Sequence, residues 1–176
     1  MTAIITNNKN ESAFQCWELL GPWTSSNTTN SSRQSQVYNF GNITNLTYSN
    51  IPPNLGSNGN RNLHNAPHVQ YIFRLLPVVS PSADDEKRLV HFMTGLAHIT
   101  LPANASAEAW FTGSTGLLIA ADIVGGGHQT TFPTKKDTIA IAGPFPNNIP
   151  PKHVVVAEEP CKENAAIFSE DYGLGD

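Results

Sequence analysis

Short runs of β-branched and aromatic residues, each bounded by turn-forming residues, are the main pattern in the second half of this chain. They recur at spacings of roughly 8–15 residues, and Pro, Gly or Asn separates one run from the next. No segment keeps the 3.6-residue period of an amphipathic helix. The pattern predicts about seven to nine short strands, arranged as an antiparallel barrel or double-sheet roll. We expect strands at residues 37–40, 68–79, 88–101, 110–124, 130–132, 138–142 and 152–157.

Glycines interrupt two of these expected strands. Gly95 lies inside the run at 88–101 and predicts a bulge in that strand. The turn residues from Gly113 to Gly116 divide the run at 110–124 into a pair of strands.

The beginning of the chain has a weaker pattern. Residues 1–12 are mostly polar, and we expect them to be frayed. Residues 14–20 are apolar enough to pack on a core. Residues 24–35 are almost entirely Ser, Thr and Asn, which is typical of an exposed loop, and residues 50–62 predict a second long loop.

These patterns predict a single all-β domain with three parts. A chain of 176 residues is long enough to bury a sizeable core without metals or disulfides. Residues 51–160 would form the barrel, and residues 1–50 would form a loop-rich extension that packs on it. Residues 161–176 would form a C-terminal tail with one short helical turn.

The composition supports a β-rich chain and excludes two classes of partner. Asn, Ser and Thr make up 46 of the 176 residues, while charged residues make up only 14%. Together with 13 Gly and 13 Pro, this favours strands joined by turns over a helical bundle. A net charge of −4, with only ten Lys and Arg, argues against nucleic acid as a partner. The longest apolar runs fall far short of the ~20 residues that cross a bilayer, so we expect no membrane partner.

Asn-x-Ser/Thr triplets occur six times, about twice the number that chance gives for this composition. Such triplets accept N-linked glycans only in chains that enter the secretory pathway. Asn-rich loops would produce the same triplets without any glycan. The candidate glycosylation sites are Asn10, Asn27, Asn30, Asn42, Asn45 and Asn104.

The first residues and the two cysteines leave the compartment open. Residues 1–6 have neither the basic region nor the apolar stretch of a signal peptide, so the chain is either cytoplasmic or a secreted protein whose signal has been removed. Cys16 and Cys161 would tie the two ends together in an oxidising compartment and would be two buried thiols in the cytosol. We expect a secretory-pathway or extracellular protein.

Two motifs carry the candidate chemistry. The first is HNAPHVQYIF at residues 64–73, and the second is GLLIAADIVGGGH at residues 116–128. Together they resemble the two signature motifs of the cupin superfamily, and most closely those of small single-domain cupins. The resemblance covers about residues 65–157 and does not reach residues 1–50.

The resemblance implies a jelly-roll β-barrel with its site inside. In cupins, the two motifs supply histidines and one acidic residue that usually hold Fe, Mn, Ni, Cu or Zn. By position, these ligands fall here on Asn62, His64, Gln70 and His128. Asn62 and Gln70 are weak replacements for imidazole and carboxylate. We therefore expect no cofactor, with a divalent transition metal held by His64, Gln70 and His128 as the alternative.

The strand after the first motif places three side chains on one face. Because side chains alternate across a strand, Gln70, Ile72 and Arg74 point to the same side. If that side is the barrel interior, Arg74 is a buried cation that needs an anion, and Asp122 is one candidate. If the register breaks before Arg74, this side chain points to solvent instead.

The other histidines are expected mainly in structural roles. His91 and His98 are seven residues apart, so they share a strand face only if Gly95 forms a bulge. His153 opens the last expected strand. His128 differs from these, because it ends a Gly-rich turn where packing does not require a histidine.

Three functions fit a barrel of this kind with an apolar cavity. The first, which we expect, is acid/base isomerisation, dehydration or cyclisation of a small apolar molecule in secondary-metabolite biosynthesis, where small cupins are often used. The second is a metal-dependent cupin oxygenase. The third is a non-enzymatic secreted protein that only encloses a ligand. We also expect a homodimer, because exposed barrel edges often pair in cupins.

The first function assigns a role to each motif residue. His64 or His128 would move protons, Gln70 would orient an oxygen atom, and Arg74 would stabilise developing negative charge. A barrel mouth with aromatic walls and a few polar groups is suited to a small apolar ligand. The expected substrate-binding residues are Tyr71, Ile72, Asp122 and Phe132.

Overall fold

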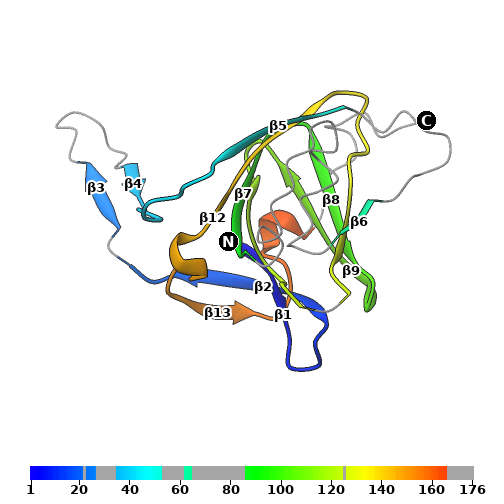
Figure 1. The fold of residues 1–176 in the computed structure, drawn as a ribbon, viewed down its shortest axis with the longest axis horizontal. Coiled ribbons are helices and arrows are strands. Elements are labelled where there is room, and N and C mark those ends of the chain that lie inside the picture. Colours follow the sequence, from blue (N-terminus) through cyan, green and yellow to red (C-terminus); the bar gives the residue numbers. More distant parts are fainter. Residues whose placement is uncertain (22, 27–34, 53–61, 65–85, 125, 166–176) are drawn as a thin grey trace.

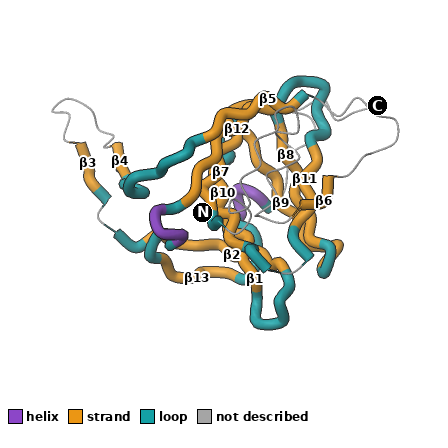
Figure 2. Tube along the Cα trace, viewed as in Figure 1, coloured by secondary structure: helices purple, strands orange, loops and turns teal. Residues whose placement is uncertain are grey.

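The computed structural model describes residues 1–21, 23–26, 35–52, 62–64, 86–124 and 126–165. In these ranges the protein is all-β, as the sequence predicts, with two short 3₁₀ turns, η2 (Pro146–Asn148) and η3 (Lys162–Asn164) (Figure 2). Within the described part of the chain, no helix is long and apolar enough to span a bilayer.

The strands form two main sheets that face each other, and a small hairpin (Figure 1). In sheet order, the seven-stranded sheet contains β13 (His153–Ala157), β2 (Ser12–Leu19), β1 (Thr2–Thr6), β10 (Leu117–Ala121), β7 (Arg88–Thr94), β12 (Thr138–Pro144) and β5 (Thr47–Ile51). The four-stranded sheet contains β6 (Asn62–His64), β11 (His128–Thr131), β8 (Leu96–Leu101) and β9 (Asn104–Thr112). The hairpin consists of β3 (Thr24–Ser26) and β4 (Ser35–Val37).

An apolar core fills the space between the two main sheets. Because side chains alternate across a strand, one face of each sheet supplies this core. The buried residues are Ile4, Phe14, Phe92, Leu118 and Ala140 from the larger sheet, and Ala97, Ile99, Leu101, Ala109 and Phe111 from the smaller one. Each fully buried large side chain of this kind contributes roughly 1.5–3 kcal/mol to folding.

A second apolar cluster covers the opposite face of the larger sheet. Ala3 and Ile119 pair across β1 and β10, and each is adjacent in sequence to a residue of the first core, Ile4 or Leu118. Trp17, Leu19, Ala121 and Phe145 complete the buried part of this cluster. The central strands of the sheet are therefore covered on both faces.

Gly95 marks the point where the chain leaves one sheet for the other. The sequence predicts one bulged strand at 88–101, but β7 ends in the seven-stranded sheet and β8 begins in the four-stranded sheet. Gly95 has a φ of +75°, which residues with a side chain rarely adopt, and a Cβ at this position would collide with Thr138. The prediction of a bulge at Gly95 itself is wrong, because this glycine forms a corner between two strands; the register of β7 against β12 shifts two residues earlier, between Phe92 and Thr94.

The turn from Gly113 to Gly116 makes a similar transition. The sequence predicts two strands around this turn, and β9 and β10 confirm them. The two strands do not pair with each other, because β9 lies in the four-stranded sheet and β10 in the seven-stranded sheet. Each of these glycine-containing segments therefore connects the two sheets.

The first strand lies in the interior of the seven-stranded sheet. We expected residues 1–12 to be frayed, but β1 pairs in antiparallel orientation with β2 and in parallel orientation with β10. Thr2, Ala3 and Ile4 are completely buried. The expectation was wrong because the partners of this short strand are distant in sequence. β1 and β2 belong to the main sheet, although the sequence assigns residues 1–50 to an extension.

A disulfide between Cys16 and Cys161 links β2 to the C-terminal segment. The two Cα atoms are 4.7 Å apart, and the bond closes a sequence separation of 145 residues. Of the two alternatives that the sequence leaves open, the structure shows the paired cysteines.

The short turn η3 follows this disulfide and confirms the expected helical turn in the tail. Its last residue, Asn164, is buried and satisfies polar groups from three segments. Asn164 Oδ1 accepts a hydrogen bond from Thr2 Oγ1 at 2.8 Å. Asn164 Nδ2 donates to the backbone oxygens of Trp110 and Thr115 at 2.8 and 2.9 Å. The tail is therefore tied to both β1 and the turn after β9.

The remaining predictions of strands and loops are confirmed in some segments and wrong in others. Residues 14–19 of the apolar segment 14–20 lie in β2. The strands β11, β12 and β13 confirm those expected at 130–132, 138–142 and 152–157. The exposed loop expected from residue 24 is wrong at its beginning, where β3 forms, and the strand expected at 37–40 is wrong because β4 ends at Val37. The strand expected at 68–79 lies outside the described residues.

Candidate functional site

A cavity lies between the two sheets, on the inner faces of β5, β7, β10 and β12 and against β8 and β11. Its volume is ≈ 60 Å³. That volume is room for about four to six water-sized groups. Its apolar walls are Val90, Phe92, Ile99, Leu118, Ala120, Phe132, Ala140 and Ala142. Its polar lining residues are Thr47, Ser49, Arg88, His128 and Thr130.

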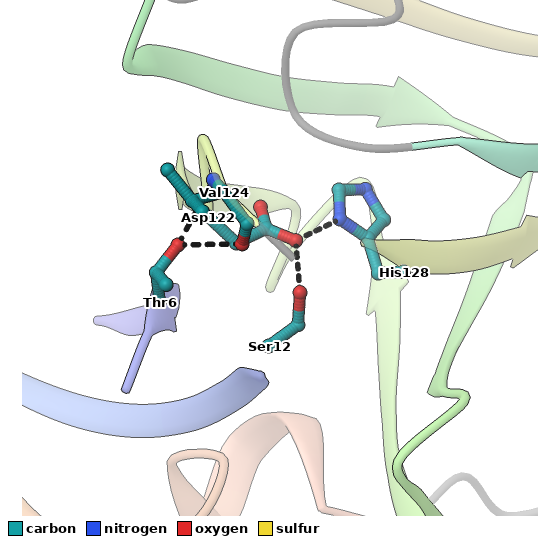
Figure 3. A network of polar contacts seen from close by, with 5 residues as sticks. All are labelled: Thr6, Ser12, Asp122, Val124 and His128. Atoms are coloured by element: carbon teal, nitrogen blue, oxygen red, sulfur yellow. Dashed lines mark hydrogen bonds and ion pairs between the residues drawn. The ribbon is translucent and has the colours of Figure 1, made fainter. Parts of the chain in front are cut away.

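His128 brings an imidazole to this cavity and is held by a carboxylate. His128 Nδ1 lies 2.9 Å from Asp122 Oδ2, and Ser12 Oγ donates to the same oxygen at 2.8 Å (Figure 3). All three residues are buried, with 3% of His128, 0% of Asp122 and 4% of Ser12 exposed. Because water does not screen groups at such depth, these charge-assisted contacts are stronger than surface ones.

Three strand ends position this group. Asp122 directly follows β10, His128 begins β11, and the turn between them includes Gly127 with a φ of +70°. Thr6, the last residue of β1, holds the same turn through Val124: its Oγ1 donates to the carbonyl at 3.0 Å and accepts from the amide at 3.2 Å (Figure 3). Because β1 runs parallel to β10, both strands end beside this turn.

The carboxylate of Asp122 determines where His128 carries its proton. An ionised carboxylate only accepts hydrogen bonds, so Nδ1 of His128 donates to it and Nε2 keeps the basic lone pair. A histidine oriented in this way can take a proton and later return it. Within the described part of the chain, the other carboxylate oxygen, Oδ1, has no hydrogen-bond partner. The carboxylate therefore directs its contacts through a single oxygen, Oδ2.

Arg88 brings a second polar group to the cavity, from the opposite sheet. It is the first residue of β7, and its Nη2 lies 3.2 Å from Glu86 Oε2. The Arg88 side chain is 9% exposed and the Glu86 side chain is 37% exposed. The described residues that line the cavity include no carboxylate. The cavity thus combines apolar walls with an imidazole on one sheet and a guanidinium on the other.

The structure brings together some of the residues that the sequence singles out. His128 and Phe132 line the cavity, and Asp122 contacts His128 and Ser12. The backbone of His64 pairs with that of His128 across β6 and β11. The expected residues outside the described part of the chain are Gln70, Tyr71, Ile72 and Arg74.

The described residues around the cavity do not fit a metal ion. No group of three or more His, Cys, Asp or Glu side chains in the described part of the chain could hold one. The cavity lining supplies one imidazole, together with a guanidinium that would repel a divalent cation. Gln70 and the side chain of His64 lie outside this description, so the metal set His64, Gln70 and His128 stays a prediction.

Three other histidines lie outside the cavity. His98 stacks on Trp110 with ring centroids 3.7 Å apart, and His153 stacks on Trp17 at 3.4 Å. His91 lies on the outer face of β7, because its neighbours in the strand point into the cavity. The corner after β7 places His91 and His98 in different sheets, so they do not share a strand face.

Sequence reasoning missed Ser12 and Arg88. Ser12 is 110 positions away from Asp122, and no local pattern indicates their contact. Arg88, Val90 and Phe92 are every second residue of β7, and all three lie on its inner face. The parity argument applied to Arg74 would have found Arg88 as well, had it been extended to this strand.

Four of the six candidate glycosylation sites lie in the described residues. Asn10, Asn42, Asn45 and Asn104 are all exposed, and Asn27 and Asn30 lie outside the described ranges. The triplet at Asn10 is unusual, because its third residue is the buried Ser12 of the site.

No protein-family model matches this chain, and no curated protein or solved structure matches it either.

Proposed function

We propose that this protein is an enzyme that uses His128 as a general acid/base on a small, largely apolar molecule held between its two sheets. The observation that carries the proposal is the buried contact between His128 and Asp122 at the edge of an apolar cavity. Isomerisation, dehydration and cyclisation fit this arrangement best. Each moves a proton between atoms of one molecule, and none needs a second substrate.

The chemistry follows from the contacts of His128. Its Nε2 would accept a proton from the substrate, and the imidazolium so formed would be stabilised by the adjacent Asp122 carboxylate. The imidazolium, which exchanges its Nε2 proton with solvent, would then donate a proton to another atom of the substrate or to a leaving hydroxyl. Ser12 holds the carboxylate in place while this occurs. A positioned acid/base group of this kind contributes roughly 10²–10⁴-fold to a rate.

The test is the exchange of solvent hydrogen into a substrate. The protein is incubated in D₂O with a library of small apolar metabolites, which are then examined by mass spectrometry and NMR. An acid/base enzyme introduces deuterium into its substrate, or converts it to an isomer or to a dehydrated product. The His128→Gln variant should lose about 100-fold or more of this activity.

The matched control is His98→Gln, which removes an imidazole that lies on Trp110 outside the cavity. This variant should keep the activity of the unaltered protein. Conversion that is as fast in His128→Gln as in the unaltered protein contradicts the proposal. Activity that is lost with a chelator and restored by a transition metal supports the metal-dependent alternative instead.

A second candidate, ligand binding without turnover, is favoured by the apolar walls of the cavity. It gives a different result in the same experiment. A ligand would bind and be recovered unchanged, with no deuterium, and His128→Gln would bind it with the same affinity.

We also propose that the two sheets belong to a cupin-like jelly roll and that the protein passes through the secretory pathway. The transitions between sheets at Gly95 and at the turn after β9 support the fold. The disulfide and the exposed Asn side chains of four triplets support the compartment. Secretion of this protein from its source cells, with a loss of mass on endoglycosidase treatment, tests the compartment. Sedimentation tests the expected homodimer.

A further inference from the structure

Two buried hydroxyl groups face the cavity without a hydrogen-bond partner among the described residues. They belong to Thr130 on β11 and to Ser49 on β5, and both residues line the cavity. Only 4% of Thr130 and 6% of Ser49 is exposed. Both hydroxyl oxygens keep accessible surface, unlike Asp122 Oδ1, which is fully enclosed. Because the two residues are almost completely buried, this surface lies towards the cavity.

The other polar groups of the cavity lining already have partners. Thr47 Oγ1 donates to the backbone oxygen of Ala142 at 2.9 Å. The guanidinium of Arg88 and the Nδ1 atom of His128 each contact a carboxylate. Water satisfies an open hydroxyl only until a ligand displaces it, and a ligand that does not replace the lost hydrogen bond binds more weakly. The two open hydroxyls therefore favour a ligand with a hydrogen-bonding atom.

Strand pairing holds these hydroxyls on opposite walls of the cavity. Thr130 lies two residues after His128 on the inner face of β11, and neighbours on one face of a strand are about 6.5 Å apart. Ser49 lies on the facing seven-stranded sheet, where it pairs with the cavity residue Ala140. The cavity is small, at ≈ 60 Å³, so a single small ligand contacts both walls. Such a ligand can bind both hydroxyls and lie beside the imidazole.

We propose that the molecule held in this cavity is a small, neutral carbonyl compound whose oxygen accepts hydrogen bonds from Ser49 and Thr130. The inference rests on the proposed function, because it takes the same cavity as the active site. A carbonyl oxygen has two lone pairs, one for each of the two hydroxyl donors. The carbon skeleton of the ligand contacts the apolar walls.

A carbonyl group also makes the proposed proton transfer chemically feasible. Hydrogen on the carbon next to a carbonyl is far more acidic than hydrogen on an ordinary hydrocarbon, because the charge moves to oxygen. An alcohol offers no such hydrogen, and the charge of a carboxylate makes its neighbouring hydrogens much less acidic. The combination of two hydroxyl donors with a base therefore favours a neutral carbonyl compound.

The reaction would proceed through an enolate. Nε2 of His128 takes the proton, the electron pair of the C–H bond forms a C=C bond, and a pair of the C=O bond moves to oxygen. Ser49 and Thr130 stabilise the negative charge that develops there. The imidazolium then protonates another carbon of the enolate, which gives an isomer, or protonates a hydroxyl that leaves as water, which gives the dehydrated product.

The experiment measures binding of two probes by NMR titration. Butan-2-one carries a carbonyl oxygen and has a size that suits the cavity, and 2-methylbut-1-ene has the same shape with a methylene group in place of that oxygen. The unaltered protein should bind both. Thr130→Val and Ser49→Ala should each weaken binding of butan-2-one by about threefold or more, as the loss of a neutral hydrogen bond predicts. The double variant should weaken it by about tenfold or more, with no loss for 2-methylbut-1-ene.

The matched control is Thr131→Val. Thr131 follows Thr130 in β11, points away from the cavity, and donates to the backbone oxygen of His98 at 3.5 Å. This variant should bind both probes as the unaltered protein does. A second measurement is the NMR resonance of the carbonyl carbon in bound butan-2-one. It should lie at higher frequency in the unaltered protein than in the double variant, because donated hydrogen bonds draw electron density from that carbon.

Three results would overturn the inference. The unaltered protein could fail to bind butan-2-one, the double variant could bind it as tightly as the unaltered protein, or the double variant could lose affinity equally for both probes. If the double variant does not fold, Thr130→Val and Ser49→Ala decide the question separately, by affinity and by the resonance of the carbonyl carbon.

The two proposals fail in different ways. Deuterium exchange that depends on His128, into a substrate without a carbonyl group, together with butan-2-one binding that does not depend on the hydroxyls, would overturn the carbonyl inference and support the proposed function. Butan-2-one binding that depends on both hydroxyls, with no exchange into any carbonyl compound of the library and no conversion of one, would support the inference and contradict the proposed function.

Discussion

At the scale of single residues, the Asp122 carboxylate is the group on which the site depends most. It is completely buried, and Ser12 and His128 both direct their contacts to its Oδ2 atom. A buried charge is costly unless it receives hydrogen bonds. Each of these two residues therefore contributes to stability as well as to the arrangement of the site.

Replacing Ser12 with Ala removes one of these two contacts. We expect the free energy of unfolding to fall by about 1–3 kcal/mol, because the buried carboxylate loses a donor. Urea denaturation of the unglycosylated variant measures the change. Ser106→Ala is the matched control: Ser106 is also the third residue of a glycosylation triplet, and it donates to Asn104, but this contact is exposed. Equal losses in the two variants would contradict the structural role given to Ser12.

The residues of the site differ in how far the sequence predicts them. Asp122, His128 and Phe132 lie close together in the chain, in or beside one motif, and local spacing was enough to select them. Ser12 reaches the site through strand pairing across many residues, which no local pattern reveals. Alternation along β7 indicates which side chains share a face with Arg88, but only strand pairing shows that this face lines the cavity. The sequence alone therefore predicts the site residues in and beside one motif, and the remaining site residues become evident only when the pairing of the strands is known.

At the scale of the strands, the corners between the sheets determine which residues can face the cavity. Gly95 ends β7 and sends β8 to the opposite side of the core. The extended conformation of residues 88–101 was predictable from their run of apolar residues. The change of sheet was not, because a bulge and a corner can both be formed by one glycine with a positive φ.

Replacing Gly95 with Ala tests this corner. The φ of +75° is unfavourable for Ala, and the added Cβ would collide with Thr138. We expect a loss of about 1–3 kcal/mol or more in the free energy of unfolding. Gly126→Ala is the control, because a Cβ there meets nothing within 4 Å. A loss in Gly95→Ala no larger than the loss in Gly126→Ala would show that the corner does not need a glycine. Thermal or urea denaturation provides the measurement.

The strand β1 shows the limit of pattern reading at this scale. Its five-residue segment alternates too weakly to stand out from the polar sequence around it. It becomes buried only because β2 and β10 pair with its two edges. Burial of such a strand is a property of its partners, so its own composition does not predict it.

At the scale of the whole molecule, the disulfide joins segments near the two ends of the chain. Cys16 lies in β2, and Cys161 leads into the tail that Asn164 ties to β1. The sequence predicts that these cysteines could meet but not that they do, because the choice depends on the position of β2 beside β13. The all-β class, in contrast, follows from composition and spacing alone.

Removing the disulfide should destabilise the whole protein. A bond that closes a separation of 145 residues restricts the unfolded chain strongly. We expect the Cys16→Ser, Cys161→Ser double variant to lose about 2–5 kcal/mol in the free energy of unfolding. Reduction with dithiothreitol should produce a similar loss in the unaltered protein and no change in the double variant. A reduced protein as stable as the oxidised one would mean that the hydrogen bonds of the tail are sufficient.

The parallel pairing of β1 with β10 also sets an order of events during synthesis. The first strand leaves the ribosome early, but Ile4 has no partner on one side until Ala120 has been made. The centre of the larger sheet therefore closes late, as is typical of folds with many distant contacts. Until then, Ser12 is accessible to an enzyme that reads the triplet at Asn10. Any glycan at Asn10 is added in this interval, before the sheet closes over Ser12, the third residue of the glycosylation triplet.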